Sequence, residues 1–138
     1  MVIIDTNVIS EMMRPTPSPL VHRWLGAQPR TRVYSTTICE AEIFAGVSLL
    51  PRGKKRDRLT EIAEEIFAGL LAGRVLPFDS AAARAYGELL VARRRHGRAV
   101  ATFDVQIAAI ALSVGADLAT RNIDDFDDTG IVVINPWN

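Results

Sequence analysis

The sequence VIIDTN at residues 2–7 decides the fold, because three β-branched residues end abruptly at Asp5. Short apolar runs of this kind are typical of strands that are buried on both faces of a parallel sheet. The polar residues that follow can cap a helix, which we expect to reach about Met13. The chain therefore opens with a strand, a polar turn and a helix, which is the beginning of a βα unit.

The same alternation continues along the chain and predicts an α/β fold around a mainly parallel sheet. One of Ser35, Thr36 and Thr37 is expected to cap the third helix, and Asp79 or Ser80 the fifth. Further strands are expected at 32–34, 75–78, 118–119 and 131–134, and helices at about 20–25, 37–50, 59–71, 80–95 and 103–114.

Composition limits the possible functions. The 138 residues are 49% apolar and 23% charged with zero net charge, which is typical of a globular protein with no overall attraction to nucleic acid. Cys39 is the only cysteine, so an intramolecular disulfide and a cysteine-rich zinc site are excluded. We find no signal peptide and no apolar run near the roughly 18 residues of a membrane span, so we expect a complete chain in the cytoplasm.

Acidic residues occur where open parallel sheets usually bind ligands, beyond the carboxyl ends of strands. Asp5 directly follows the first strand, although it could also simply cap the next helix. Glu40 and Glu42 lie in an otherwise apolar helix, where Glu42 shares a face with Ile38, Ala41, Ala45 and Leu49. Because a second apolar stripe exists, helical periodicity does not choose between the two glutamates, and both could be solvated.

Two more acidic positions follow later in the chain. Asp104 precedes a helix that is apolar almost all round and hence buried, although it could be a first-turn acid favoured by the helix dipole, with Thr102 as the cap. Residues 124–128, DDFDD, follow the fourth strand and could also be a solvated loop. Carboxylates gathered at one point repel each other and need a cation, and oxygen ligands suit Mg²⁺ or Mn²⁺. Neither His22 nor His96 has a partner at zinc-like spacing.

The order and spacing of these acidic motifs resemble those of the PIN-domain ribonucleases, and in particular of the VapC-like toxins of bacterial toxin–antitoxin modules. The resemblance extends over nearly the whole chain, at residues 3–7 (IIDTN), 40–42 (EAE), 103–109 (FDVQIAA), 119–122 (ATRN), 125–126 (DF) and 133–137 (VINPW). It implies that residues 1–138 form a single PIN domain, a three-layer α/β/α sandwich with a central sheet of about five short strands.

The resemblance also implies site residues. Asp5, Glu42 and Asp104 match the three catalytic, metal-binding acids of the family, which favours Glu42 over Glu40. Asn122 stands where the family often has a fourth acid, and Asp124 and Asp125 are the nearby candidates for that role. The supporting polar residues would be Thr6, Asn7, Thr120 and Asn122.

The activity implied is hydrolysis of RNA phosphodiester bonds by water activated on Mg²⁺ or Mn²⁺, in a homodimer that a cognate antitoxin inhibits. Basic residues offer local contacts for the RNA backbone despite the zero net charge. One cluster is Arg52, Lys54, Lys55, Arg56 and Arg58, and a second is Arg93, Arg94, Arg95 and Arg98. Both clusters could instead be solvated helix ends.

Two other functions remain open at this point. A non-catalytic PIN fold kept for binding or dimerisation is suggested by Asn122 in place of an acid. A phosphatase of the haloacid-dehalogenase type also begins with a strand followed by Asp, but it needs a second Asp at the position of Asn7.

Overall fold

A computed structural model describes residues 1–97, 101–127 and 129–138. Its sheet has five strands in the order β3-β2-β1-β4-β5, and all neighbouring pairs are parallel. The strands are β1 (Val2–Ile4), β2 (Val33–Thr36), β3 (Val75–Leu76), β4 (Asp117–Ala119) and β5 (Val133–Ile134). The expected sheet of about five short strands is confirmed, with the first strand at its centre.

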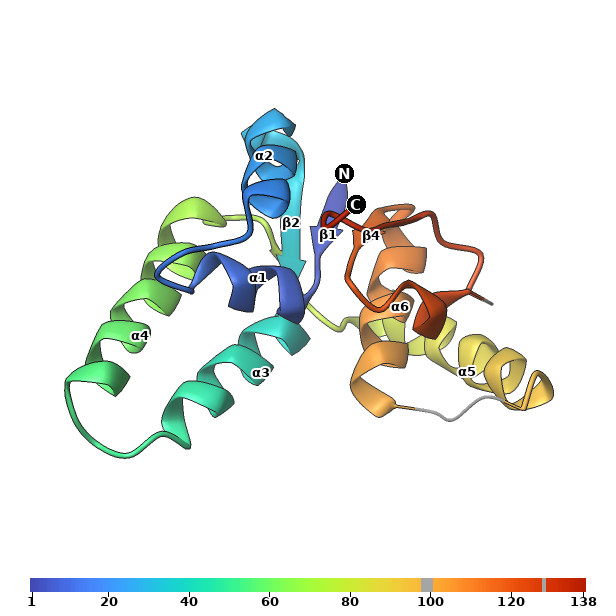
Figure 1. The fold of residues 1–138 in the computed structure, drawn as a ribbon. Coiled ribbons are helices and arrows are strands. Elements are labelled where there is room, and N and C mark those ends of the chain that lie inside the picture. Colours follow the sequence, from blue (N-terminus) through green and yellow to red (C-terminus); the bar gives the residue numbers. More distant parts are fainter. Residues whose placement is uncertain (98–100, 128) are drawn as a thin grey trace.

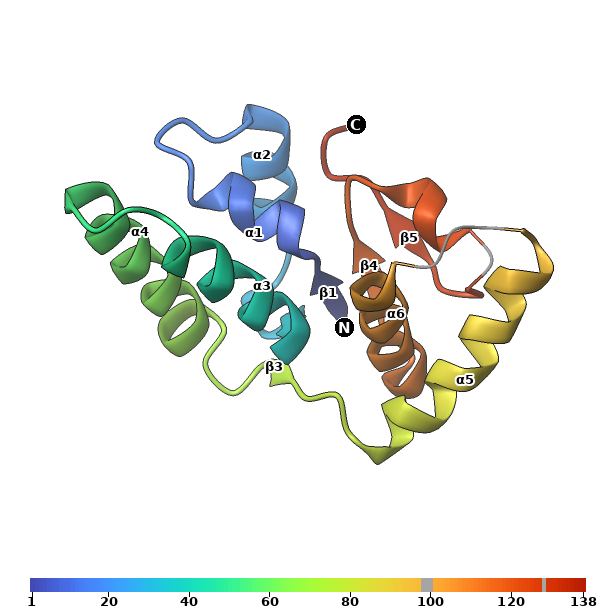
Figure 2. The ribbon, with the colours of Figure 1, turned by 90° about the horizontal axis from the view of Figure 1, so that it is seen from below.

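Within the described ranges, six α-helices accompany the sheet: α1 (Thr6–Met12), α2 (Pro19–Ala27), α3 (Thr37–Ser48), α4 (Lys54–Glu64), α5 (Ser80–Arg95) and α6 (Thr102–Val114). Figures 1 and 2 show α1 to α4 on one side of β1 and α5 and α6 on the other. This arrangement is the predicted α/β/α sandwich. Among the helices of the described residues, none has both the length and the apolar character that a membrane crossing requires.

The core is built around β1 and α6. Ile3 and Ile4 of β1 are completely buried, because helices cover both faces of the central strand. Helix α6 is buried over most of its circumference, as its sequence predicts, by Val105, Ile107, Ala108, Ala109, Ile110 and Ala111. The buried β1 and α6 are the elements that carry Asp5 and Asp104 at their ends.

Several element boundaries differ from the sequence-based expectation. Arg32 belongs to a 3-10 turn (Arg30–Arg32), and β2 instead extends to Thr36. Thr36 is the cap among the three candidates, because its hydroxyl accepts the N–H of Cys39 at 3.1 Å. Strand β3 ends at Leu76, since the next residue is Pro77, which has no N–H for a ladder.

Two helices also begin earlier than expected. Helix α4 begins at Lys54 rather than Leu59, so the basic residues are helical, and its end continues as a π-helical segment (Glu65–Leu70). Gly53 precedes it with φ of 154°, a conformation that glycine adopts easily. Helix α6 includes Thr102, and its cap is Ala101, so Thr102 is not the cap.

Candidate active site

Asp5 lies at the carboxyl end of the central strand, where it both ends β1 and begins α1. Its N–H donates to the carbonyl of Ala119 in β4 at 2.9 Å, and its own carbonyl accepts the N–H of Val8 at 3.0 Å. Its side chain accepts the N–H of Thr6 at 2.7 Å and therefore caps the helix. The capping role and the position at the functional edge of the sheet thus belong to the same residue.

Hydrogen bonds from the adjacent turn and from the distant Thr120 fix the Asp5 carboxylate, which is only 4% exposed. Its Oδ2 accepts the hydroxyl of Thr120 at 2.7 Å and the side-chain amide of Asn7 at 3.2 Å. The Asn7 amide also donates to Thr120 Oγ1 at 3.1 Å. Burial raises the pKa of Asp5 above its usual range, and the hydrogen bonds, led by that from Thr120, oppose this shift.

Glu42 faces Asp5 from helix α3. Its Oε1 accepts the hydroxyl of Thr6 at 2.9 Å, and burial raises the pKa of its carboxyl group. The buried stripe of α3 consists of Cys39, Ile43 and Val47. The expected apolar face around Glu42 is therefore not the buried one, and Leu49 at its end is 86% exposed. Glu42 borders the core rather than lying in it, which leaves its carboxylate accessible.

Asp104 completes the group from the first turn of α6. Burial is the main cause that raises its pKa to about 6, and the charges of Asp5, Asp125 and Glu42 act in the same direction. The positive charge of Arg93 opposes the shift. The carboxylates that come from β1, α3 and α6 therefore interact electrostatically in the folded chain.

These acids open into one cavity of about 530 Å³. The cavity is lined by Asp5, Thr6, Asn7, Ser10, Glu11, Arg14, Glu42, Asp104, Arg121, Asn122 and Trp137. Glu40 is half-buried and is not one of them. The geometry thus separates the two glutamates that helical periodicity left equivalent.

The donor chemistry of this cavity suits a hard divalent cation, because carboxylate oxygens are the preferred ligands of Mg²⁺ and Mn²⁺. Across the described ranges, no three Asp, Glu, His or Cys side chains approach closely enough to form a ligand set by themselves. A cation here would therefore keep water ligands, as Mg²⁺ usually does in proteins.

The sequence model of the PIN domain matches residues 2–132. The chain belongs to the PIN-domain family. A haloacid-dehalogenase-type phosphatase is therefore excluded, in line with the Asn at position 7.

Named relatives align with this PIN domain over almost their whole length. A plasmid stability protein, StbB, of Pseudomonas syringae pv. tomato is 46% identical, with 99% of each chain covered. The toxin FitB of Neisseria gonorrhoeae is 40% identical and the VapC ribonuclease Y4jK of Sinorhizobium fredii is 38% identical, each with 98% or more of both chains covered. The crystal structure of FitAcB from Neisseria gonorrhoeae superposes with a TM-score of 0.93, at 40% identity and over 100% of this chain and 99% of that chain.

Asn122 stands at the position expected for the fourth acid, and Asp124 and Asp125 are the acidic candidates near it. Asn122 lines the cavity, and its backbone N–H donates to Thr120 Oγ1 at 3.2 Å. Asp125, in a 3-10 turn (Ile123–Phe126), raises the pKa of Asp104 through its charge. Asp124 is exposed and does not line the cavity as far as the structure is described. The charge of Asp125 therefore reaches Asp104, and Asp125 stays a candidate for the fourth acid.

Sequence reasoning missed several residues of the site. Glu11 is 6% exposed, accepts the N–H of Ser18 at 3.0 Å and pairs with Arg14 at 3.5 Å. The i,i+3 spacing of Glu11 and Arg14 could have indicated this pair. Arg121 and Trp137 meet only in the folded chain, so no local pattern could have indicated them.

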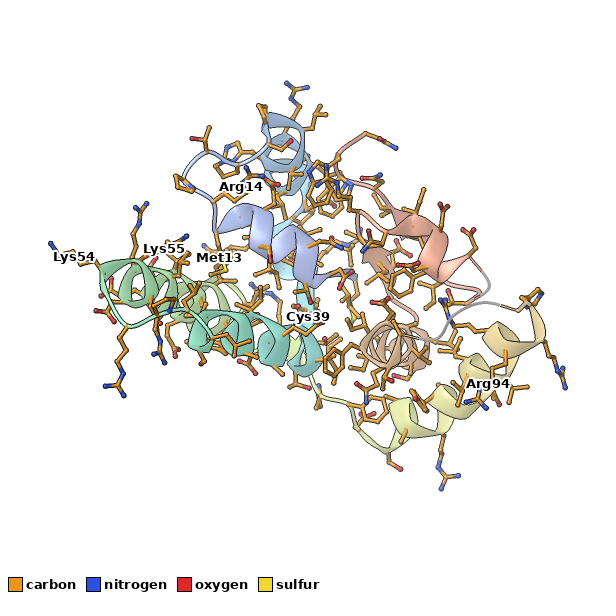
Figure 3. All side chains as sticks on the ribbon, turned by 60° about the horizontal axis from the view of Figure 1, so that its bottom comes forward. Met13, Arg14, Cys39, Lys54, Lys55 and Arg94 are labelled. Atoms are coloured by element: carbon orange, nitrogen blue, oxygen red, sulfur yellow. The ribbon has the colours of Figure 1, made fainter. Side chains whose placement is uncertain are left out.

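The two basic clusters differ in position. Figure 3 shows Lys54 and Lys55 at the start of α4, on the side of Arg14, whereas Arg94 lies far away on α5. A second cavity of about 380 Å³ shares Thr6, Ser10, Arg14 and Glu42 with the first and includes Lys55. A smaller cavity beyond it is lined by Lys54, Lys55 and Arg58. In the described ranges, Arg52 and Arg56 line none of these three cavities.

Arg93 is buried and does not lie on the surface of the second basic cluster. It is 4% exposed and donates to the backbone carbonyl of Asp125, which ties α5 to the turn beside Asp104. Arg94 and Arg95 are exposed, and Arg98 lies outside the described residues. The second basic cluster is therefore not a continuous surface for RNA.

Proposed function

We propose that this chain is a metal-dependent endoribonuclease that acts as the toxin of a toxin–antitoxin pair. The observation that carries the proposal is the cavity at the carboxyl edge of the sheet, into which Asp5, Glu42 and Asp104 open from three different elements. The relatives named toxin and VapC ribonuclease support this activity, because they align over nearly the full chain.

Asp5, Asp104 and Glu42 would hold Mg²⁺ or Mn²⁺, directly or through water. Such a cation lowers the pKa of a bound water and neutralises the charge that develops on the phosphodiester. The chain's own polar residues supply the orientation: Asn7 and Thr120 fix the Asp5 carboxylate, and Thr6 fixes one oxygen of Glu42. Groups that hold ligands in this way are needed for both affinity and activity.

The RNA backbone has a path towards this cavity along α1 and α4. The second cavity continues from the first and brings Lys55 and Arg14 to one groove, and Lys54 and Arg58 follow. Phosphate groups need only such a local row of cations. The proposed contacts are accordingly Lys54, Lys55, Arg58 and Arg14, with Arg52 and Arg56 outside the groove.

Incubation of the purified chain with single-stranded RNA tests the proposed activity. Cleavage is expected with Mg²⁺ or Mn²⁺ and should stop when a chelator is added. Asp5→Asn and Asp104→Asn should each reduce the rate by a factor on the order of 10²–10⁴ while the circular dichroism spectrum stays unchanged. Cleavage by both variants at the wild-type rate would remove the assignment of the site.

The toxin role requires a second experiment in bacterial cells, where the proposed cytoplasmic location gives the enzyme access to RNA. Expression of the chain alone should arrest growth, and co-expression of a small protein encoded beside it, the cognate antitoxin, should restore growth. Harmless high-level expression of an active enzyme would refute the toxin role and leave the nuclease activity intact. The proposed homodimer is measured separately by light scattering on the purified chain.

A non-catalytic PIN module is the second candidate, and one observation favours it. Asn122 rather than an acid lines the cavity, so one anionic ligand of the usual set is absent at that position. Under this alternative, neither RNA cleavage nor a Mn²⁺-dependent rise in melting temperature is expected. The same incubation and a thermal melt with millimolar Mn²⁺ distinguish the two functions.

A further inference from the structure

Arg121 and Trp137 form a stacked pair at the cavity that holds the acids. The guanidinium carbon of Arg121 lies 4.9 Å from the centroid of the Trp137 ring, a distance typical of a cation–π contact. Both side chains line the cavity beside Asp5 and Asp104. Arg121 is exposed, whereas Trp137 is half-buried and provides a fixed surface for it.

Backbone hydrogen bonds hold this pair from two directions. The N–H of Arg121 donates to Asn7 Oδ1 at 3.1 Å, which connects Arg121 to the network around Asp5. The N–H of Trp137 donates to Asn135 Oδ1 at 2.9 Å, just after β5. The backbone of Arg121 is therefore held by the same network that holds Asp5, and the Trp137 ring places its guanidinium.

The guanidinium of Arg121 keeps its hydrogen-bonding capacity for a ligand. Within the described part of the chain, no carboxylate or carbonyl pairs with it, whereas Arg14, the other arginine of this cavity, is paired with Glu11. A guanidinium that stacks on an aromatic ring still presents its N–H donors in its plane, in the geometry that matches a phosphate.

The charge of the cavity explains why a cation is needed at this place. Asp5, Glu42 and Asp104 all line it, whereas Arg14 offsets the charge of Glu11, so an RNA strand approaches an acidic surface. Repulsion between these carboxylates and the phosphates opposes binding unless positive charge lies nearby. A divalent ion offsets part of this repulsion, and a fixed arginine at the same cavity offsets another part without any metal.

We propose that Arg121, oriented by Trp137, is a phosphate-binding site that holds an RNA phosphate neighbouring the one that is cleaved. The inference rests on the proposed nuclease function and extends it, because it assigns a substrate contact outside the acids and outside the α4 cluster. Arg121 acts as a binding residue, and Trp137 acts as a positioning residue that reduces the freedom of the guanidinium.

The test is binding of a short single-stranded RNA in chelator, so that no metal contributes and no cleavage occurs. Affinity is measured over a series of salt concentrations. Arg121→Ala should weaken binding roughly tenfold and reduce the slope of log K against log salt by about 0.7, the value for one phosphate contact in a single strand. Arg121→Lys should keep the slope and lose part of the affinity, because the charge remains but the planar donors are lost.

Two further variants make the test specific. Arg23→Ala, on the exposed surface of α2 and away from the cavity, removes the same charge and should leave the slope unchanged. Trp137→Phe should keep most of the affinity, since an aromatic face remains, and should abolish the change in tryptophan fluorescence on RNA binding, with Trp24 as the remaining emitter. Trp137→Ala should weaken binding while the salt slope stays near that of the wild type.

The outcomes separate this inference from the proposed function. An Arg121→Ala variant with the slope and affinity of the wild type, or a wild-type chain that does not bind RNA in chelator, overturns the phosphate site. If Arg121 governs RNA binding but the chain with Mg²⁺ or Mn²⁺ cleaves no RNA, the nuclease proposal fails and the phosphate site remains.

Discussion

The hydroxyl of Thr6 donates a hydrogen bond of 2.9 Å to Oε1 of Glu42, which lies 36 residues further along the chain. The backbone N–H of the same Thr6 donates to Asp5 Oδ1 at 2.7 Å. Thr6 therefore holds two of the three proposed metal-binding acids, Asp5 through its backbone N–H and Glu42 through its side-chain hydroxyl. This relationship gives Glu42, and not Glu40, a defined orientation towards the site.

The first prediction concerns these two glutamates. Glu42→Gln should reduce the rate of RNA cleavage by a factor on the order of 10² or more, because it removes a proposed metal-binding carboxylate. Glu40→Gln, in the same helix but off the cavity, should change the rate less than about threefold. Initial rates on a fluorogenic RNA with Mn²⁺ measure both. A larger loss in Glu40→Gln would show that α3 presents a different residue to the substrate.

The second prediction concerns the stability of the metal-free protein. Asp104 has its pKa raised by burial and by neighbouring carboxylates, so its ionised form is unfavourable in the folded state at pH 7.5. Asp104→Asn should raise the melting temperature in chelator by on the order of 2–5 °C and shrink the rise that Mn²⁺ produces. Thermal melts with chelator and with Mn²⁺ measure both effects.

Asp57→Asn is the matched control for that prediction. Asp57 lies in the first turn of α4, as Asp104 does in α6, and it is exposed and away from the cavity. If Asp104 served only to complement the helix dipole, both variants would lose a little stability. A stabilised Asp104→Asn beside a slightly destabilised Asp57→Asn is the expected result, and equal losses would contradict the cluster of repelling acids.

The third prediction is a pH dependence. The pKa of Asp104 is about 6, and those of Asp5 and Glu42 are also raised, so protons compete with a cation for the site. Affinity for Mn²⁺ should increase from pH 5 to pH 7 and then change little through Asp104. Calorimetric titration at three pH values measures this increase. An affinity that is constant from pH 5 to pH 7 would contradict ligation by these groups.

Asp104 also makes the stability of the metal-free protein depend on pH, but this stability decreases with rising pH whereas the affinity for Mn²⁺ increases. The folded-state pKa of Asp104 exceeds its ordinary value of 3.8. At a pH between these two pKa values, the folded chain therefore binds the proton more tightly than the unfolded chain does. The contribution of Asp104 to stability in chelator is therefore greatest at low pH and is lost as the pH rises through about 6. Urea unfolding should show a flatter pH profile in Asp104→Asn than in the wild type, and identical profiles would contradict the shift.

The fourth prediction concerns Thr120. Thr120→Val removes the hydroxyl that donates to Asp5 at 2.7 Å, and it should cost about 1–3 kcal/mol of stability and weaken Mn²⁺ binding roughly 10–100-fold. Thr129→Val is the control, because its buried hydroxyl donates to the Phe126 carbonyl at 2.6 Å. The control should lose similar stability with unchanged metal affinity. Equal metal affinity in both variants would show that Thr120 has only a structural role.

The sequence predicted the architecture well because the buried elements have unambiguous patterns. The run before Asp5 and the apolar helix after Asp104 each allow one interpretation, and both are buried as expected. The boundaries were less predictable at the start of α4, where residues 54–58 are polar and carry no apolar stripe. Helical propensity and the glycine before Lys54 determined that boundary, and periodicity alone does not contain this information.

The site was predictable only as far as it depends on sheet topology. Strand ends of a parallel sheet meet at one edge, so Asp5 and the segment after the fourth strand could both be placed at that edge. The contact of Asp5 with Thr120 also requires β1 and β4 to be neighbours, which the strand pattern does not contain. The choice of Glu42 depended on the family resemblance, because the rotation of α3 is fixed by the packing of Cys39 and Ile43. Contacts such as Arg121 on Trp137 join two loops, and loops carry no periodicity from which a contact could be inferred.

The strand order has a consequence for how the protein is made in the cell. β1 precedes the other four strands of the sheet along the chain, yet one of its two neighbours, β4, ends at Ala119. A nascent chain that has not reached β4 contains Asp5 and Glu42 but has neither Thr120 nor the β4 carbonyl that accepts the Asp5 N–H. Because a domain generally folds as a unit, the proposed site assembles only after β4 has been synthesised. An enzyme that degrades RNA would thereby remain inactive until β4 has emerged from the ribosome that produces it.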